Sequence, residues 1–397
     1  MTLDKKKYAD DSLKDNTDNL VSLFCDACKN RTNPLGKNVI SLSGGFDSRL
    51  VAACIYRDKI ACQGITYLEP GWKPLLGKRS EADIAKKVSD IFGLDWKDFG
   101  PIRASAQDFI TLLRIKLGSI HLGYSFMLPL LKSLNKEFFS DAIFLTGYGG
   151  GRVFVNLLPP KKNGNMDELV HSIMNNEGFL SLSDVSTLVQ ISEDEIIDEL
   201  KRVLTTYPEK ELDQKYVHFI IYGGSFKAIF EVEDRDRLYL WSTSPFYSIP
   251  VFNYVMNCSD VNKSSRALHR EMLRTLSPSA TAVDNSDYGC SIVSYKFRVI
   301  VPFLKSMIFR YPILKRMAAR IVRNKNSDVL DGRMISCVKD QMKNCEYLLR
   351  YFSRAKLDDM AINPAKYGLH AVYHLFTIIS LIEQIYSKNS TIGKYYD

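Results

Sequence analysis

A short glycine-bearing turn is the part of this 397-residue sequence best suited to chemistry. It reads Ser43-Gly44-Gly45-Phe46-Asp47-Ser48 and lies between an expected strand and an expected helix. Two glycines let a backbone approach an anion closely, and the amides of a helix N-terminus favour negative charge. Asp47 adds a carboxylate of the kind that holds Mg²⁺ against phosphate oxygens. The turn therefore predicts a phosphate site, although a tight turn with a capping serine is the simpler alternative.

The turn is positioned by an alternation of expected strands and helices. Apolar runs and the breaks between them predict the strands 38–43, 60–68 and 142–146 and the helices 48–56 and 80–92. This alternation indicates an α/β fold, a parallel twisted sheet with flanking helices on both faces. Ligands of such sheets bind beyond the carboxyl ends of the strands. Because Gly44 and Gly147 each follow an expected strand, we expect two glycine turns at one edge of the sheet.

The later half of the chain reads mainly as helix. Ser192-x-x-Glu195 has the pattern of a capping box ahead of an apolar helical face, and the stretch 367–386 is apolar enough for a docked core helix. We therefore expect two regions, an α/β region at 1–158 that carries the phosphate turn and a mainly helical C-terminal half at 159–397.

Five segments carry a resemblance to a known family. The string SLSGGFDSRLVAA (41–53) resembles the pyrophosphate-loop signature of the N-type ATP pyrophosphatases, which split ATP into AMP and pyrophosphate. Four further segments look like the synthetase domain of asparagine synthetases and β-lactam synthetases: ACQGITY (61–67), LTGYGG (145–150), EDR (233–235) and PF (245–246). The resemblance extends from about residue 15 to about residue 290 and implies an adenine nucleotide α-hydrolase-like fold.

The resemblance implies an ATP-dependent ligase that forms amide bonds. A substrate carboxylate is adenylated with release of pyrophosphate, and an amine or ammonia then displaces AMP, which is a good leaving group. ATP and Mg²⁺ are the implied cofactors, with Asp47 as the metal ligand. The implied nucleotide-binding residues are Ser43, Gly44, Gly45, Asp47, Ser48 and Gly147. No preceding glutaminase domain is expected, since Thr2 stands where that domain needs a nucleophilic cysteine.

A tyrosine in the second glycine loop points to the β-lactam synthetase pattern. The resemblance implies that Tyr148, paired with Glu231 or else with Glu233, takes a proton from the attacking amine. An ordinary tyrosine has a pKa near ~10, so it needs such a partner to relay a proton at neutral pH. The alternative is that Tyr148 only packs over the nucleotide and that both glutamates lie on a solvated helix face.

Three departures from the family pattern weaken the expectation of catalysis. Gly151 replaces the second magnesium-binding aspartate, Arg152 replaces a neighbouring acid, and no lysine lies near 287–289 to contact pyrophosphate. These losses reduce the stabilisation of the departing pyrophosphate. We expect Arg152 to compensate, because a guanidinium pairs well with phosphate oxygens. A degenerate nucleotide-binding protein without catalysis is the alternative.

The cysteines offer a weaker alternative. Cys25-x-x-Cys28 would suit an RNA-thiolating enzyme of the same superfamily, yet both residues fall on an expected helix and no second pair completes a zinc set. The eight cysteines show no paired framework, and the N-terminus lacks the apolar core of a signal peptide. We expect a cytoplasmic protein, with peripheral membrane association as a further option.

The formal net charge of +8 comes from one acid-free segment, 291–327. Its nine cations are Lys296, Arg298, Lys305, Arg310, Lys315, Arg316, Arg320, Arg323 and Lys325. Apolar residues alternate with them at roughly helical spacing, as in helices that lie on an anionic membrane or an acidic protein partner. The alternative is an apolar face packed on the core, and nucleic acid is not expected because no RNA-binding motif accompanies the charge.

Overall fold

The computed structural model describes residues 7–69, 80–138, 141–310, 332–344, 346–386 and 391–396. The chain forms two compact units. Unit 1 comprises 1–102, 130–158 and 221–310, and unit 2 comprises 103–129, 159–220 and 311–397. Because each unit draws on both of the expected regions, 1–158 and 159–397, the expected domain boundary stays a prediction.

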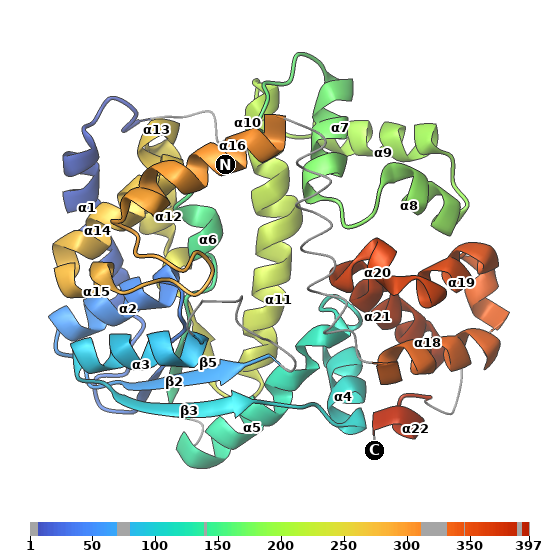
Figure 1. The fold of residues 1–397 in the computed structure, drawn as a ribbon, viewed down its shortest axis with the longest axis horizontal. Coiled ribbons are helices and arrows are strands. Elements are labelled where there is room, and N and C mark those ends of the chain that lie inside the picture. The colour runs from blue at the N-terminus through green and yellow to red at the C-terminus, as the bar shows by residue number, and fades with distance from the viewer. Residues whose placement is uncertain are drawn as a thin grey trace. The chain divides into compact units, whose positions relative to one another are not determined.

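Unit 1 is built on a parallel five-stranded sheet, which confirms the predicted fold class (Figure 1). The strands are β1 (Asn38–Ser41), β2 (Gln63–Leu68), β3 (Asp95–Pro101), β4 (Ile143–Leu145) and β5 (Trp241–Thr243). Their order is β3-β2-β1-β4-β5, and every neighbouring pair is parallel. The direction of strand addition therefore reverses between β1 and β4, and a parallel sheet binds its ligands at such a reversal.

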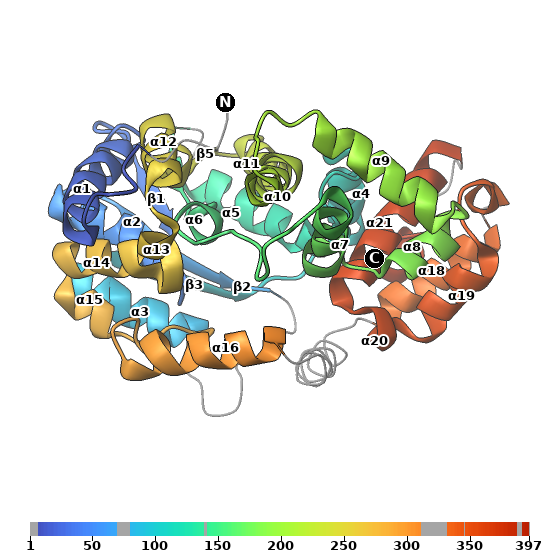
Figure 2. The same ribbon diagram turned by 90° about the horizontal axis from the view of Figure 1, so that it is seen from above.

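Helices cover both faces of the sheet. Right-handed crossovers that add strands in opposite directions place their helices on opposite faces. Accordingly, α3 (Glu81–Phe92) and α5 (Met127–Phe138) lie on opposite sides of β2 and β3 (Figure 2). Helix α2 (Phe46–Arg57) has a run of buried residues from Ser48 to Ile55. A helix that is apolar nearly all round belongs in a core, so the turn before α2 has a firm support.

The remaining elements of unit 1 are mostly helical. They are α1 (Leu13–Lys29), α6 (Gly150–Val153), α11 (Phe226–Arg237), η3 (Pro245–Tyr247), α12 (Ile249–Asn257), α13 (Asp260–Lys263), η4 (Ser264–Arg266), α14 (Ala267–Leu276), α15 (Pro278–Ala282), η5 (Lys296–Ile300) and α16 (Val301–Arg310). Helix α1 packs on α2 and α14, and α14 also packs on α2. Segments more than two hundred residues apart in the sequence thus surround the glycine turn.

Unit 2 is helical in the part that the structure describes. Its elements are α4 (Ala106–Lys116), η1 (Leu122–Phe126), α7 (Met166–Glu177), α8 (Leu182–Val189), α9 (Glu193–Thr205), α10 (Leu212–His218), α18 (Gly332–Asn344), η6 (Glu346–Arg350), α19 (Arg354–Ile362), α20 (Pro364–Tyr367), α21 (Leu369–Tyr386) and α22 (Gly393–Tyr396). A π-helical turn, η2 (Phe219–Ser225), joins α10 to α11. Of the helices described, none is both long and apolar enough to cross a membrane.

Several local predictions are confirmed. The helix expected at 80–92 is α3, which Gly93 ends at φ 59°, and the predicted capping box from Ser192 to Glu195 starts α9. The structure adds a second capping box, at Ser80, at the start of α3. The strand predicted at 38–43 is shorter than expected, because Leu42 and Ser43 already belong to the turn.

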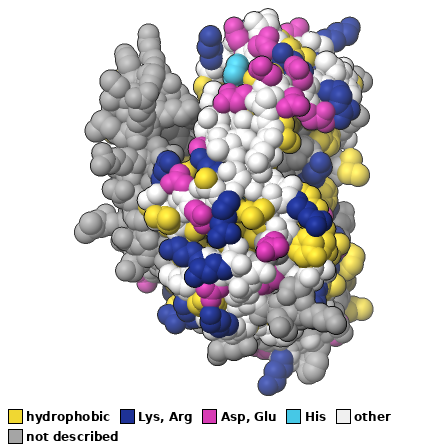
Figure 3. All heavy atoms as spheres, turned by 90° about the vertical axis from the view of Figure 1, so that its right-hand side faces the viewer, with side chains coloured by type: hydrophobic (Ala, Val, Ile, Leu, Met, Phe, Trp, Pro, Cys, Tyr) yellow, Lys and Arg dark blue, Asp and Glu magenta, His cyan; other side chains and the backbone are white. Residues whose placement is uncertain are grey.

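The acid-free segment is described only in part, since 311–327 lies outside the described residues. Where it is described, η5 and α16 present large apolar side chains to solvent, with Tyr295 71% and Phe303 60% exposed. Charges elsewhere are mixed: both signs are interspersed among apolar side chains on the face drawn in Figure 3.

Candidate functional site

The first glycine turn is held in shape by its own serines. The Ser43 amide donates to Ser48 Oγ at 3.1 Å, the Gly45 amide donates to Ser43 Oγ at 3.1 Å, and the two hydroxyl oxygens lie 3.0 Å apart. Gly45 caps α2 without a side-chain hydrogen bond. The first amides of α2 therefore lack a side-chain cap, as an anion site at a helix N-terminus requires.

A carboxylate already reaches this turn. Glu81, the first residue of α3, accepts a hydrogen bond from the Gly44 backbone, and burial raises the pKa of its carboxyl group. A Cβ at Gly44 would lie 2.8 Å from the side chain of Ser286, so only glycine fits there. An internal carboxylate on a loop amide shows that the turn accepts an anionic oxygen.

The carbonyl side of the turn is anchored by a fully buried arginine. Arg49 donates to the carbonyl oxygens of Ala280 at 3.0 Å, Val283 at 2.8 Å and Asp284 at 2.9 Å, and more weakly to that of Gly44 at 3.4 Å. Burial lowers the pKa of its guanidinium to about 10. Arg49 therefore ties the glycine turn to the chain that follows α15.

The second glycine loop packs directly on the first. A Cβ at Gly147 would lie 2.9 Å from the Ser48 amide nitrogen, and one at Gly150 would lie 2.5 Å from Asp47 Cγ. A Cβ at Gly149, whose φ is 89°, would lie 2.6 Å from the ring of Tyr247. The glycines thus allow the loops after β1 and β4 to touch, and the predicted meeting of two glycine turns is found. Gly147 approaches the backbone of α2.

Asp47 is the charged centre of this junction. Its Oδ1 accepts a hydrogen bond from Arg266 Nη1 at 3.2 Å and lies 3.4 Å from His269 Nδ1. His269 is fully buried, and its Nε2 lies 3.0 Å from the carbonyl oxygen of Phe46, to which it donates. Burial lowers the pKa of His269 to about 4, so Arg266 is the cation beside Asp47 at neutral pH.

The surroundings of Asp47 do not fit a protein-bound magnesium ion. No group of three or more acidic, histidine or cysteine residues within the described ranges is arranged to hold a metal. Mg²⁺ is usually held by carboxylates and phosphate oxygens. Here Asp47 is paired with a guanidinium, and Gly151 offers no second carboxylate. The side chains around Asp47 therefore favour a guanidinium over a divalent ion.

The expected compensating cation, Arg152, lies exposed on α6. The arginine that pairs with Asp47 is Arg266, and this ion pair spans 219 residues. No local pattern in the sequence marks Arg266, because its role depends on the packing of α14 against α2. The role assigned to Arg152 stays a prediction.

Tyr148 follows β4 and lies against a buried charged pair. Ser244 Oγ donates to its carbonyl oxygen at 2.6 Å, and its hydroxyl shares a hydrogen bond with Tyr67. Burial raises the pKa of Tyr148 well above its usual range, and Tyr67 and Asp236 add to the effect. Tyr148 is therefore a neutral phenol, and the acidic residue that acts on it is Asp236. The pairing of Tyr148 with Glu231, which lies on α11, stays a prediction.

Glu233, which lies at this edge of the sheet, has a carboxyl group whose pKa is close to neutral pH. Its carboxylate accepts from Arg237 at 3.0 Å and, at the limit of a hydrogen bond, from Thr146 at 3.5 Å. Only 2% of the residue is exposed, and burial raises its pKa from 4.5 to about 7 despite the pull of Arg237. A carboxyl group poised near pH 7 is suited to proton transfer.

The cysteine pair lies in the core of unit 1. Cys25 and Cys28 are both buried on α1, and the thiol of Cys54 is hydrogen-bonded to each of them. Burial and these contacts raise the pKa of Cys25 and Cys54 far above the usual thiol range. Thiols in such surroundings are inert, so the geometry gives no support to a cysteine-dependent reaction.

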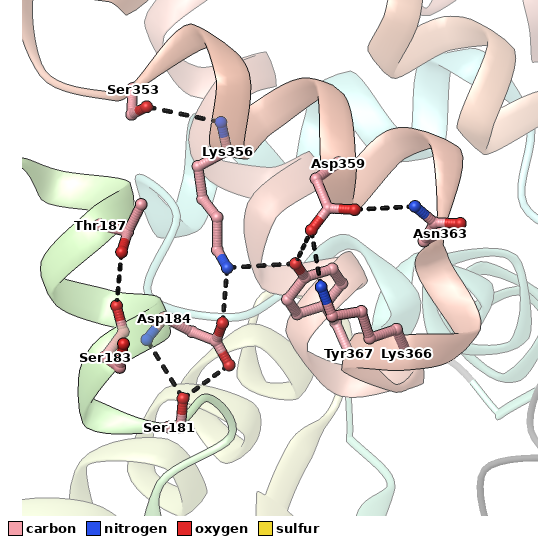
Figure 4. A network of polar contacts seen from close by, with 10 residues as sticks. All are labelled: Ser181, Ser183, Asp184, Thr187, Ser353, Lys356, Asp359, Asn363, Lys366 and Tyr367. Carbon is pink, nitrogen blue, oxygen red and sulfur yellow. Dashed lines mark hydrogen bonds and ion pairs between the residues drawn. The ribbon is translucent and has the colours of Figure 1, made fainter.

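A second polar cluster lies in unit 2 (Figure 4). Lys356 Nζ donates to Asp184 Oδ1 at 2.5 Å and to the hydroxyl of Tyr367 at 3.1 Å, and that hydroxyl donates to Asp359. Lys366 also pairs with Asp359 at 2.8 Å. Each charge in this network has a partner on α8, α19 or α20, as in a network that joins helices.

Comparison with known proteins gives no family. No protein-family model matches the chain, and no curated protein matches it. Among solved structures, NMN synthetase from Francisella tularensis is similar at 14% identity and a TM-score of 0.28, over 55% of this chain and 97% of that one. The U34-tRNA thiolase NcsA from Methanococcus maripaludis, solved with its 4Fe-4S cluster, is similar at 14% identity and a TM-score of 0.24, over 56% of this chain and 79% of that one. These low scores assign neither activity to the chain.

Proposed function

We propose that this chain is an ATP-dependent, AMP-forming ligase of the asparagine synthetase-like branch of the N-type ATP pyrophosphatases. It joins a small-molecule or peptide carboxylate to an amine or ammonia. One observation carries the proposal: the two glycine loops meet at the point where strand order reverses, beside the uncapped N-terminus of α2. That is where a parallel sheet binds a nucleotide.

In the first half-reaction, a substrate carboxylate oxygen attacks the α-phosphorus of ATP. The bond to the bridging oxygen of pyrophosphate breaks, and pyrophosphate leaves with its negative charge. The amides at the start of α2, with the hydroxyls of Ser43 and Ser48, hold the phosphates, and the guanidinium of Arg266 offsets their charge. Such preorganised donors are usually the largest contribution to stabilising a developing anion.

In the second half-reaction, the amine attacks the acyl carbon and AMP leaves. The ammonium that forms must lose a proton. We propose that Tyr148, paired with Glu231, takes up this proton. Glu233, the second candidate from the sequence, is the alternative base, because its carboxyl group, with a pKa of about 7, lies next to Thr146 at the end of β4. A base whose pKa matches the working pH transfers protons most efficiently.

The direct test is a pyrophosphate-release screen with ATP across pools of carboxylates and amines. Tyr148→Phe and Glu233→Gln should each lower amide formation more than they lower ATP binding. Intact ATP binding with no pyrophosphate released across a broad panel would indicate the nucleotide-binding pseudoenzyme. Loss of pyrophosphate release in the variant Cys25→Ser would instead indicate the RNA-thiolating alternative.

We propose in addition that the segment 291–327 attaches the chain to the cytoplasmic, anionic surface of a membrane. Its described part exposes Tyr295 and Phe303 beside Lys296 and Arg298, the pairing of apolar and basic groups that interfacial helices use. The protein should sediment with vesicles of anionic phospholipid at low salt and not with neutral vesicles. Binding that favours an acidic protein over both vesicle types would refute the membrane proposal.

A further inference from the structure

Arg266 occupies the space that a second metal-binding carboxylate would use. A Cβ at position 151 would lie 3.7 Å from Asp47 Oδ2 and 3.8 Å from Arg266 Nη2. An acidic side chain at 151 would therefore face Asp47, as two carboxylates do when they share a cation. In this chain that position is glycine, and the guanidinium lies beside Asp47 instead.

The backbone is bent to deliver this guanidinium. Ser265 and Arg266 both lie in the left-handed region, with φ of 51° and 55°. Non-glycine residues seldom adopt this conformation, and it costs of order 1 kcal/mol or more for each residue. Two such residues in succession, directly ahead of α14, indicate that the position of Arg266 is maintained against a local cost.

The second basic side chain near Asp47, His269, makes no hydrogen bond to it. His269 Nε2 uses its proton on the carbonyl oxygen of Phe46, and Nδ1 is buried without a hydrogen bond although it points towards Asp47. The charge of Asp47 is balanced by Arg266, whose Nη1 lies 3.2 Å from Oδ1. A divalent ion on Oδ1 would meet a guanidinium bound to the same oxygen, and the two positive charges would repel.

We propose that the Arg266 guanidinium takes the place of a protein-bound magnesium ion, so that the glycine turn binds the phosphate chain of a nucleotide without a divalent cation on the protein. The proposal rests on the proposed function, in which a nucleotide binds at this turn. Arginine suits the role because it is always charged and presents several donors in one plane to phosphate oxygens. Asp47 then orients the guanidinium, with its remaining donors directed to the phosphates.

The test is the affinity of the full chain for ATP and for pyrophosphate, measured by calorimetry in EDTA and again in excess Mg²⁺. The wild-type protein should bind both ligands in EDTA, with a dissociation constant within about threefold of that measured in Mg²⁺. Arg266→Asn removes the charge but tolerates the left-handed backbone. It should weaken binding in EDTA by about tenfold or more, the loss expected for hydrogen bonds to a charged group.

Arg274→Gln is the matched control, because Arg274 lies on α14, the helix that follows Arg266, pairs with Glu271 and is 65% exposed at its side chain. It should bind as the wild type does. If Arg266→Asn fails to fold, Arg266→Lys is the second variant, which keeps the charge without the planar fork. It should weaken binding of ATP and pyrophosphate less than threefold in Mg²⁺ and more than threefold in EDTA.

The results separate this inference from the proposed function. Wild-type binding that is lost in EDTA and unaffected by Arg266→Asn would overturn the role of Arg266 and leave the ligase proposal intact. Pyrophosphate binding that depends on Arg266, without any binding of ATP, would keep the cation role and overturn the ligase. Absence of binding by the wild type to either ligand would overturn both.

Discussion

Replacing Glu233 by glutamine should change how the stability of the protein depends on pH. The pKa of Glu233 is raised from 4.5 to about 7, so the folded chain holds a proton that the unfolded chain releases. Stability from this group is therefore lost as pH rises from 4.5 through 7. At about 1.4 kcal/mol for each pKa unit, the ionised carboxylate destabilises the fold by about 3 kcal/mol above pH 7.

The glutamine of Glu233→Gln cannot ionise, and its amide oxygen can still accept the hydrogen bond from Arg237. The free energy of unfolding of the variant, relative to wild type, should therefore rise by about 2.5 kcal/mol between about pH 5 and about pH 8.5. Urea denaturation followed by circular dichroism at several pH values measures this difference. Asp234→Asn is the matched control, because Asp234 is the next residue on α11 and is exposed.

A difference between Glu233→Gln and wild type that stays constant with pH, within about 0.5 kcal/mol, would refute this reasoning. It would show that Arg237 and water penetration together offset the burial of the carboxylate. An equal pH dependence in Asp234→Asn would also refute it, since the effect would then belong to the general charge of α11.

Three further predictions concern other contacts. Glu81→Gln removes the carboxylate from the first glycine turn and should tighten pyrophosphate binding severalfold in calorimetry; unchanged or weaker binding would refute the competition between this carboxylate and the ligand. Gly147→Ala places a Cβ 2.9 Å from the Ser48 amide and should cost about 1–3 kcal/mol in urea denaturation, whereas Gly224→Ala, whose added Cβ meets open space, should not show this clash. Lys356→Met leaves the polar partners of Lys356 in unit 2 without their cation and should lower the free energy of unfolding by about 2 kcal/mol; a value near zero would show that the network contributes little.

The part of the sheet that carries the first glycine turn was predictable because its signals are local. The glycine turn, the helix at 80–92 that Gly93 ends and the capping box at Ser192 each depend on a few neighbouring residues, and all of them are found in the structure. Strands β3 and β5 were not predicted. The first is a polar edge strand that contains glycine and proline, and the second is only three residues long, so neither shows a clear strand pattern.

The candidate site was less predictable for a different reason. Arg266 meets Asp47 across 219 residues, and the pKa of Glu233 is set by burial that only tertiary packing creates. Sequence patterns carry neither kind of information. The resemblance directed attention to Arg152, and to Glu231 ahead of Glu233. In the structure the cation at Asp47 is Arg266, and burial raises the pKa of Glu233 to about 7.

The buried guanidinium of Arg49 has a consequence for the order in which the protein acquires its shape. During synthesis, the glycine turn is made early, but the carbonyl groups at 280–284 that fix Arg49 follow more than two hundred residues later. Until they arrive, Arg49 lacks its three closest carbonyl partners and the turn lacks this support. Competence to hold a phosphate should therefore arise late, and fragments that end before Asp284 should be sensitive to proteases at the turn.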